Sequence, residues 1–130
     1  MNKEVSFPIA KLLKEKGLDE VSQKWYSVEG SPYYQDELDN HRGFIPAYEC
    51  EAPTIADVVM WFYEKHRIWI WVGCRELEDG TNKTIFIPQG RTIPSTKKDG
   101  FVVDIIPYTP KGSPTEAYEA AIEYTLNNLI

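Results

Sequence analysis

Residues and motifs that commonly carry catalysis or bind metal ions are scarce in this sequence. It contains two cysteines and two histidines in 130 residues. It has no Gly-x-Ser-x-Gly elbow, no His-Glu-x-x-His pair, no phosphate-binding loop and no EF-hand spacing. We therefore expect no catalytic residue, no metal site and no cofactor, and an unrecognised enzyme stays only as an alternative.

The sequence also excludes a disulfide framework and a membrane-spanning helix. Cys50 and Cys74 can form one bridge at most, and buried or idle thiols in a reducing compartment are the preferred interpretation. The most apolar stretch, residues 68–74, is far shorter than the about 20 residues that cross a bilayer. Residues 1–5 lack the apolar run of a signal peptide. These features predict a cytoplasmic protein that does not contact the membrane.

Positive charge is in short supply as well. Lys and Arg number 14 against 20 Asp and Glu, which gives a net charge of −6. This balance argues against direct coating of nucleic acid, because that requires a basic surface. In residues 29–64, eight acidic residues and one basic residue, Arg42, give a net charge of −7. This acidic segment is interpreted either as a solubilising surface or as a surface that docks on a basic partner.

Hydrophobic and aromatic residues, in contrast, are plentiful, at 42% and 13% of the chain. This is the composition of an ordinary globular protein, and it excludes wholesale disorder. The length suits one domain with one modest core. We therefore predict a single domain that spans residues 1–130.

Local signals predict three helices. Ser6 and Gly17 bracket the first helix, in which Pro8 occupies the first turn. A capping box that starts at Thr54 opens the second helix, and another that starts at Ser113 opens the third.

Hydrophobic alternation predicts strands over residues 23–28, 67–75, 83–88 and 101–106. Residues 31–53 are broken up by prolines and are expected to be irregular, with one or two short strands. Together these elements predict an α+β fold, with a mainly antiparallel sheet of about four strands and three helices that cover it.

The predicted second helix has more apolar residues than one buried face needs. Met60 and Trp61 lie off its core-facing stripe, toward the polar side. We expect these two residues to be partly exposed or to be buried between two copies of the chain. The core-facing stripe consists of Ile55, Val58, Val59 and Phe62.

The strand over residues 67–75 has two different faces, because side chains alternate along a strand. One face is aliphatic, and Ile85 and Ile87 of the next strand are expected to join it. The other face is aromatic and basic, and Thr84 and Phe86 are expected to join that one. The residues that define this second face are Arg67, Trp69, Trp71 and Arg75.

Three interpretations of the aromatic and basic face stay open. The first helix or the strand around Trp25 can cover it, which would make it core. It can form an interface with a protein partner or with a second copy, since Trp and Arg supply many interface hot spots. It can also hold a small planar anion such as a nucleotide, because indole rings stack on a base and guanidinium groups pair with phosphate.

A basic loop is predicted over residues 89–100. Arg91, Lys97 and Lys98 give it positive charge in an acidic protein. Because loops of this length often carry function, this one is interpreted either as an ordinary connection or as a cover over an anion on the aromatic and basic face.

A family resemblance rests on three blocks: AKLLKEKGLDE at residues 10–20, APTIADVVMWFYEKHRIWIWV at 52–72 and SPTEAYEAAIEYTLNNLI at 113–130. They resemble small proteins encoded by gut Bacteroidales and by their phages or prophages. The resemblance includes no catalytic signature, so it transfers no functional residue. It implies an accessory protein of a mobile genetic element inside a bacterial cell.

We therefore expect a non-enzymatic accessory protein that acts by binding a host protein or itself. The alternatives are a protein that sequesters a small anionic ligand and an enzyme that the sequence does not reveal.

Overall fold

The computed structural model describes residues 2–36, 46–94 and 104–130. The chain forms two compact units, residues 1–57 and residues 58–130, called here the N-terminal and C-terminal units. Within the described residues there are three α-helices, a π-helical segment and five antiparallel strands in two sheets. The predicted α+β class is confirmed, although the strands form two sheets where one was expected. That all 130 residues form one domain stays a prediction.

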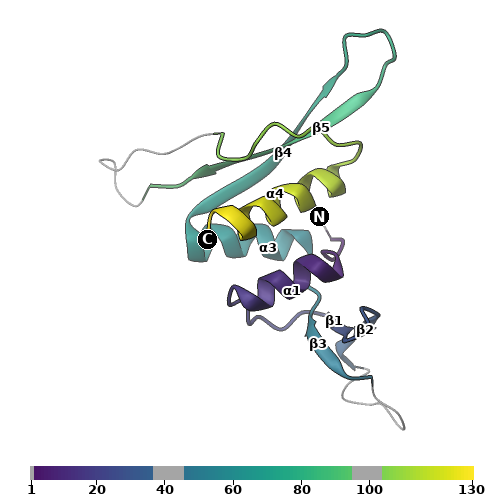
Figure 1. The fold of residues 1–130 in the computed structure, drawn as a ribbon, viewed down its shortest axis with the longest axis vertical. Coiled ribbons are helices and arrows are strands. Elements are labelled where there is room, and N and C mark those ends of the chain that lie inside the picture. The colour runs from purple at the N-terminus through teal and green to yellow at the C-terminus, as the bar shows by residue number, and fades with distance from the viewer. Residues whose placement is uncertain (1, 37–45, 95–103) are drawn as a thin grey trace. The chain divides into compact units, whose positions relative to one another are not determined.

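The N-terminal unit contains one helix and a sheet of three short strands (Figure 1). Helix α1 spans Phe7–Glu15, and the strands are β1 (Lys24–Ser27), β2 (Pro32–Tyr34) and β3 (Tyr48–Glu51). Strand β1 lies between the other two, and both pairings are antiparallel. Strands β2 and β3 confirm that residues 31–53 contain two short strands.

Helix α1 has the boundaries that its sequence predicts. Ser6 precedes the helix in an extended conformation, and a proline occupies the first turn. The helix buries Ile9 and Leu13 and packs against β3. Gly17 follows with a φ of +98°, a left-handed conformation that glycine adopts without the steric cost of a Cβ atom.

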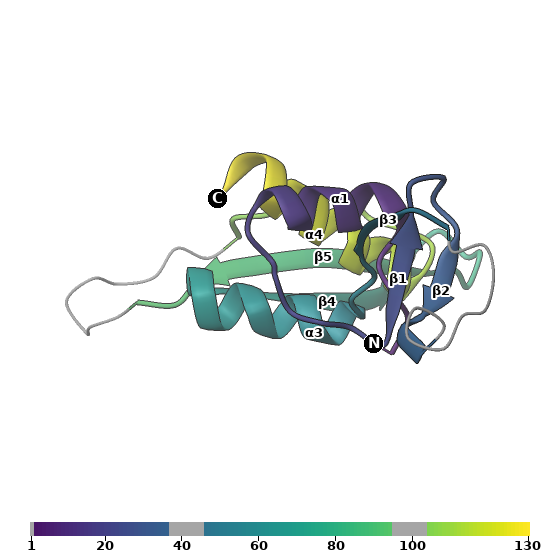
Figure 2. The ribbon, with the colours of Figure 1, turned by 90° about the horizontal axis from the view of Figure 1, so that it is seen from below.

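The C-terminal unit is built on a hairpin and a long helix (Figures 1 and 2). Helix α3 (Ile55–Trp61) begins at the end of the N-terminal unit and continues as the π-helical segment η1 (Phe62–His66). Strands β4 (Ile68–Glu76) and β5 (Thr84–Thr92) form an antiparallel pair, and α4 (Pro114–Asn128) packs against both of them.

The start and the buried side of α4 are as predicted. Ser113 caps the helix, because its Oγ atom accepts a hydrogen bond of 3.2 Å from the backbone N–H of Glu116. Leu129 was expected on the buried side as well and is half-buried. The fully buried apolar residues of the helix are Ala117, Ala121, Ile122 and Leu126.

The segment that connects β5 to α4 follows the outer edge of β5 instead of forming a strand. Phe86 and Lys111 exchange two backbone hydrogen bonds, and the N–H of Ile105 donates to the carbonyl of Gly90. The strand predicted over 101–106 is therefore wrong for residues 104–106, and residues 101–103 lie outside the described ranges. Asp104 has a left-handed φ of +56°, which a regular strand does not allow.

None of the helices in the described ranges combines the length and the apolar character needed to cross a bilayer.

Candidate functional site

The hairpin of β4 and β5 has one uninterrupted register. Ile68 lies opposite Thr92, and each later residue of β4 faces the preceding residue of β5 without a bulge. Beyond the strands, the N–H of Leu77 donates to the carbonyl of Lys83 at 2.8 Å. The connection over residues 77–83 is therefore closed by a backbone bond that continues the same register.

This register corrects the predicted faces of β5. Directly opposed residues of an antiparallel pair share one face of the sheet, so odd-numbered residues of β4 share a face with odd-numbered residues of β5. Ile85 and Ile87 consequently lie on the aromatic and basic face, where Thr84 and Phe86 were expected. The prediction relied on matching hydrophobic residues across the hairpin, and this match does not determine the register.

The even-numbered face of the hairpin is the core face near its base. Ile68, Ile70, Pro88 and Gly90 are all buried. Gly90 allows a close approach, since a Cβ atom added there would lie 3.0 Å from the side chain of Ile106.

The odd-numbered face carries the predicted tryptophans and arginines, and none of its residues is fully buried. Trp69 and Trp71 are half-buried, while Arg75 and Arg91 are exposed. This partial exposure argues against the interpretation of the face as ordinary core. We call it the Trp/Arg face, and it consists of Trp69, Trp71, Gly73, Arg75, Ile85, Ile87, Gln89 and Arg91.

Segment η1 extends this face beyond Trp69. The rings of Tyr63 and Trp69 meet edge to face, with 5.8 Å between their centroids. The guanidinium group of Arg67 lies 5.4 Å from the centroid of the Tyr63 ring, which is the geometry of a cation–π contact. Arg67 has a left-handed φ of +57° and ends η1, so the chain turns there from the helix into β4. Arg67 was predicted to be a member of the strand face, but it precedes β4 and lies only at the margin of the face.

Tyr108 contacts the face at its other end. Arg75 donates a hydrogen bond of 2.8 Å to the Tyr108 hydroxyl, and its guanidinium group lies 5.8 Å from the centroid of the same ring. Sequence reasoning missed Tyr108, because nothing local indicates that a residue 33 positions further along returns to β4.

The predictions for Met60 and Trp61 have different outcomes. Met60 is 44% exposed, which confirms that it lies off the core. Trp61 is only 4% exposed, so the expectation that it is surplus to the core is wrong. Its ring packs against those of Phe62 and His66, at centroid distances of 5.4 and 4.7 Å. The four residues of the expected stripe are all buried, Phe62 included, so the buried side of the helix is wider at this end than the stripe alone.

The predicted basic loop is shorter than expected. Residues 89–92 belong to β5, so Arg91 is part of the Trp/Arg face and not of a loop. Lys97 and Lys98 lie outside the described residues. The idea that these lysines close over a ligand therefore stays a prediction.

Glu51, in the acidic segment, has a structural role. The Oε1 atom of Glu51 accepts hydrogen bonds from the N–H of Ser22 at 2.7 Å and from the amide of Gln35 at 2.8 Å, and Oε2 accepts one from the Tyr48 hydroxyl at 2.6 Å. Glu51 thus joins parts of the N-terminal unit that are distant in sequence. Both interpretations of the acidic segment, as a solubilising surface and as a docking surface, stay predictions, and residues 37–45 lie outside the described ranges.

Both cysteines are free, so the alternative of a bridge between them is wrong. Cys50 is 1% exposed, and burial raises the pKa of its thiol to about 11. It is therefore a protonated and inert thiol, as predicted. Cys74, near the tip of the hairpin, is exposed.

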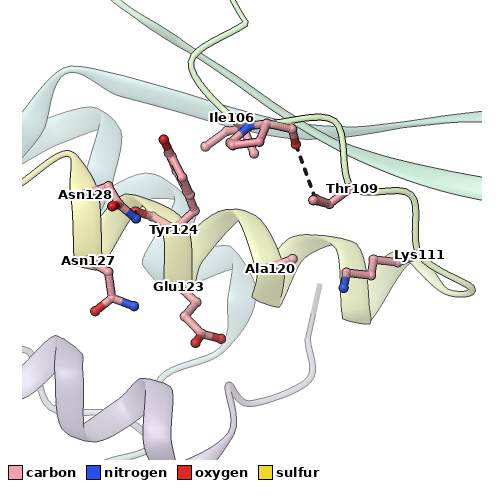
Figure 3. A pocket seen from close by; sticks show the side chains of 9 residues that line it. Ile106, Thr109, Lys111, Ala120, Glu123, Tyr124, Asn127 and Asn128 are labelled. Carbon is pink, nitrogen blue, oxygen red and sulfur yellow. Dashed lines mark hydrogen bonds between the residues drawn. The ribbon is translucent and has the colours of Figure 1, made fainter.

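A cavity of about 310 Å³ lies between α4 and the segment before it (Figure 3). Its lining includes Lys111, Glu123 and Tyr124. Figure 3 shows the Tyr124 side chain pointing toward Ile106 while the Glu123 side chain points to the other side of the helix. These polar groups do not converge on one point, as they would around a bound ligand. Neither Trp69 nor Trp71 lines this cavity.

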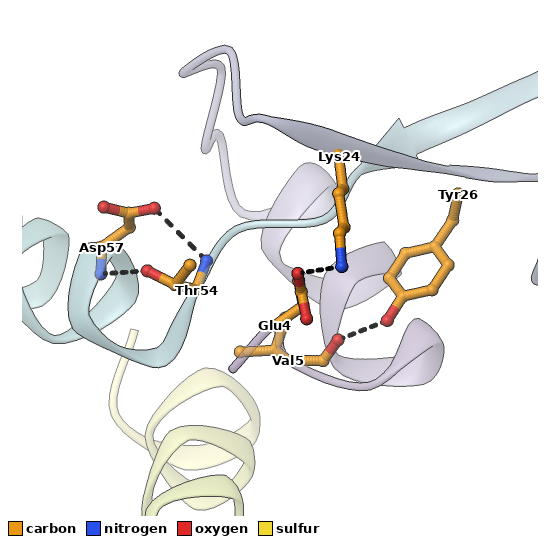
Figure 4. Close-up of polar contacts among 6 residues, drawn as sticks. All are labelled: Glu4, Val5, Lys24, Tyr26, Thr54 and Asp57. Carbon is orange, nitrogen blue, oxygen red and sulfur yellow. Dashed lines mark hydrogen bonds and ion pairs between the residues drawn. The ribbon is translucent and has the colours of Figure 1, made fainter. Parts of the chain in front are cut away.

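A polar hollow of about 580 Å³ lies in the N-terminal unit. Lys24 and Glu4 on its wall form an ion pair of 2.7 Å (Figure 4). Thr54 and Asp57 form the predicted capping box, in which each side chain accepts a hydrogen bond from the backbone N–H of the other residue. These polar groups are already paired with each other, so they serve the fold of this unit.

Comparison with known proteins adds no function. No family model, curated protein or solved structure matches the chain. The described part of the chain also contains no group of three or more His, Cys, Asp or Glu side chains that could hold a metal ion. The Trp/Arg face is therefore the feature that best indicates a function.

Proposed function

We propose that the protein acts by binding another protein through the Trp/Arg face. The supporting observation is that two tryptophans and two isoleucines share one face of the hairpin and are all only half-buried. A monomer gains more hydrophobic stabilisation by burying such side chains completely. Half-exposed Trp beside Arg is, in contrast, the composition of interface hot spots.

The charge of the face suggests the chemistry of the partner. The face has Arg75 and Arg91 but no acidic residue, and Arg67 lies at its margin. A complementary partner surface presents carboxylates around apolar side chains. Charge complementarity of this kind steers association and selects among partners.

The biological setting comes from the resemblance to proteins of Bacteroidales and their phages. We propose that the partner is a protein of the bacterial host and that the chain is an accessory protein of a mobile element. In this setting, the protein works in the cytoplasm and blocks or recruits its partner.

Site-specific crosslinking tests the proposal. A photoreactive benzoylphenylalanine at position 71 should capture a partner in cells that make the protein, and mass spectrometry identifies it. The same group at position 21 is the matched control, because Val21 is apolar and 83% exposed but does not belong to the face.

The captured partner is then purified and titrated. Trp71→Ala should weaken its binding at least tenfold, as expected for a hot spot, whereas Val21→Ala should leave the affinity unchanged. Equal affinity of both variants for every captured protein would contradict the proposal. Quenching of tryptophan fluorescence by a mononucleotide alone, lost in Trp71→Ala, would instead support the sequestering function.

A further inference from the structure

The outer edge of β4 has a hydrogen-bonding pattern that the neighbouring segments reveal. In an antiparallel pair, opposed residues alternate between exchanging two backbone bonds and exchanging none. Phe86 of β5 exchanges both of its backbone bonds with Lys111, at 2.9 and 2.8 Å. It therefore exchanges none with Cys74, which lies opposite it in β4. The N–H and C=O groups of Cys74 consequently point away from β5.

Two other backbone bonds agree with this alternation. The carbonyl of Gly90 accepts from Ile105 at 3.2 Å, so Gly90 also directs a polar group away from β4. At the odd-numbered position before β4, the carbonyl of Arg67 accepts from Ile93 at 2.7 Å. The even-numbered residues of β4 thus present their backbone groups on its outer edge.

Only the half of this edge near the hairpin tip is accessible. Ile68 and Ile70 are 5% and 1% exposed, which leaves their backbone without room for another strand. Val72 is half-buried, and Cys74 and Glu76 are exposed. The tip of the hairpin extends beyond α4 (Figure 1).

Among the described residues, no strand and no backbone hydrogen bond joins this edge. β4 has no proline, no lysine and no bulge, three features that keep edges unpaired, and its two charged residues, Arg75 and Glu76, limit the registers in which another strand can pair. An edge of this kind favours the addition of a strand.

We propose that the outer edge of β4 pairs with the same edge of a second copy, antiparallel and with Cys74 at the two-fold axis. In this register Cys74 faces its counterpart, and Val72 faces Glu76 of the other copy. All three residues direct their backbone groups outward, so each of these pairs is of the hydrogen-bonded type. The register uses the accessible edge, residues 72–76, and no buried residue.

Charge and burial exclude the neighbouring registers. Moving the axis one residue toward the tip places Arg75 opposite its counterpart, and moving it two residues places Glu76 opposite its counterpart. Like charges directly opposite each other destabilise a sheet. Moving the axis the other way engages Ile70, which is 1% exposed. The register centred on Cys74 instead places Arg75 opposite Gly73, which has no side chain to collide with it.

Such a dimer has a four-stranded sheet in the order β5-β4-β4-β5. The two-fold axis is perpendicular to the sheet, so both Trp/Arg faces lie on the same side. The dimer thus presents one enlarged face to a partner. The pairing itself depends on the backbone edge of β4, and it holds or fails independently of the proposed function.

Two substitutions at one position test the pairing. Cys74→Ser keeps the outward N–H group, and light scattering under reducing conditions should show a dimer as for the unmodified chain. Cys74→Pro removes that N–H group but no bond to β5, and proline is tolerated on edge strands. This variant should be folded, as judged by circular dichroism, and monomeric. A reduced chain that is monomeric up to high micromolar concentration would overturn the proposal.

Crosslinking tests the register even if Cys74→Pro fails to fold. Hydrogen-bonded pairs have Cα atoms about 5.5 Å apart, which is within the range of a disulfide. Diamide, which accepts two hydrogen atoms from two thiols, should crosslink the unmodified chain through Cys74. In the Cys74→Ser background, Val72→Cys alone should not crosslink, whereas Val72→Cys together with Glu76→Cys should. Crosslinking of Val72→Cys alone at the same rate would overturn the register.

Discussion

The two sheets of this protein differ in whether they contain a central strand, that is, a strand with a neighbour on each side. The N-terminal sheet has strands of only three or four residues, yet the central strand β1 has neighbours on both sides and buries Trp25, Tyr26 and Ser27. The C-terminal hairpin has strands of nine residues, but none of its strands lies between two others. A short central strand thus completes a core, whereas the long hairpin leaves one face half-buried and, among the described residues, one edge unpaired.

Polar groups follow the same division. In the N-terminal sheet, the indole N–H of Trp25 donates to the carbonyl of Tyr34 at 3.1 Å, and Glu51 accepts from three donors. On the Trp/Arg face, Arg75 contacts the ring and hydroxyl of Tyr108, which is itself 59% exposed. The first sheet is stabilised internally, while the second keeps its charged groups near water.

The largest expected effect is the loss of the central tryptophan of the first sheet. Trp25 is 1% exposed, and its ring stacks on Tyr33 at a centroid distance of 4.9 Å. Trp25→Ala should lower the free energy of unfolding by about 3–5 kcal/mol, because it removes buried contacts and leaves a cavity. Urea denaturation monitored by far-ultraviolet circular dichroism measures this change. A loss below about 1 kcal/mol would mean that this sheet is not the complete core that its burial indicates.

Local signals explain which elements the sequence predicts well. Ser113 with Glu116, and Thr54 with Asp57, cap helices through bonds between residues three positions apart. Such spacing is visible in any single sequence. The alternation in β4 likewise placed Trp69, Trp71 and Arg75 on one face, as the structure shows.

The sequence could not predict features that depend on distant partners. The face on which Ile85 lies follows from the register of the hairpin, and a shift of one residue reverses every side chain. Trp61 is buried where α-helix changes to π-helix, a change that has no simple sequence signal. Glu51 was one acidic residue among eight, and two of its three partners lie 16 and 29 positions away.

A smaller effect is expected for the polar network of the first sheet. Glu51→Ala leaves the donors of Ser22, Gln35 and Tyr48 without their carboxylate. Since hydrogen bonds to charged groups contribute about 1.5–3 kcal/mol and this site is only partly buried, the free energy of unfolding should fall by about 2 kcal/mol. Glu29→Ala, at an exposed residue of the same acidic segment, should change it by less than about 0.5 kcal/mol. Equal losses of stability in the two variants would mean that the hydrogen bonds of Glu51 do not stabilise the fold.

The Trp/Arg face should contribute less to stability than either feature of the first sheet. Trp71 is half-buried and belongs to a sheet of two strands. Trp71→Ala should therefore lower the free energy of unfolding by no more than about 1 kcal/mol, in line with substitutions outside a packed core. Denaturation of Trp71→Ala beside Trp25→Ala gives the comparison directly. Equal losses would show that the face is core, and the proposed function would lose its support.

The smallest effect is a pH dependence that arises beside the hairpin, at His66. This imidazole packs against the rings of Trp61 and Phe62, and the resulting desolvation lowers its pKa from the ordinary value of 6.5. The unfolded chain then binds a proton at a higher pH than the folded chain does. Stability should therefore be unaffected above pH 6.5 and should fall as the pH decreases from 6.5 toward the pKa of the folded state.

Urea midpoints of the unmodified chain and of His66→Gln, measured between about pH 8 and pH 5, test this dependence. Glutamine stays neutral over the whole range, so the difference between the two chains isolates the titration of His66. The pKa of Glu4 is lowered as well, from 4.5, because it pairs with Lys24, but that group loses its stabilisation only at lower pH. The unmodified chain should lose more stability on acidification than His66→Gln. Parallel pH profiles would mean that the His66 imidazole is solvated in the folded state. The base of the hairpin would then be as exposed to solvent as its tip.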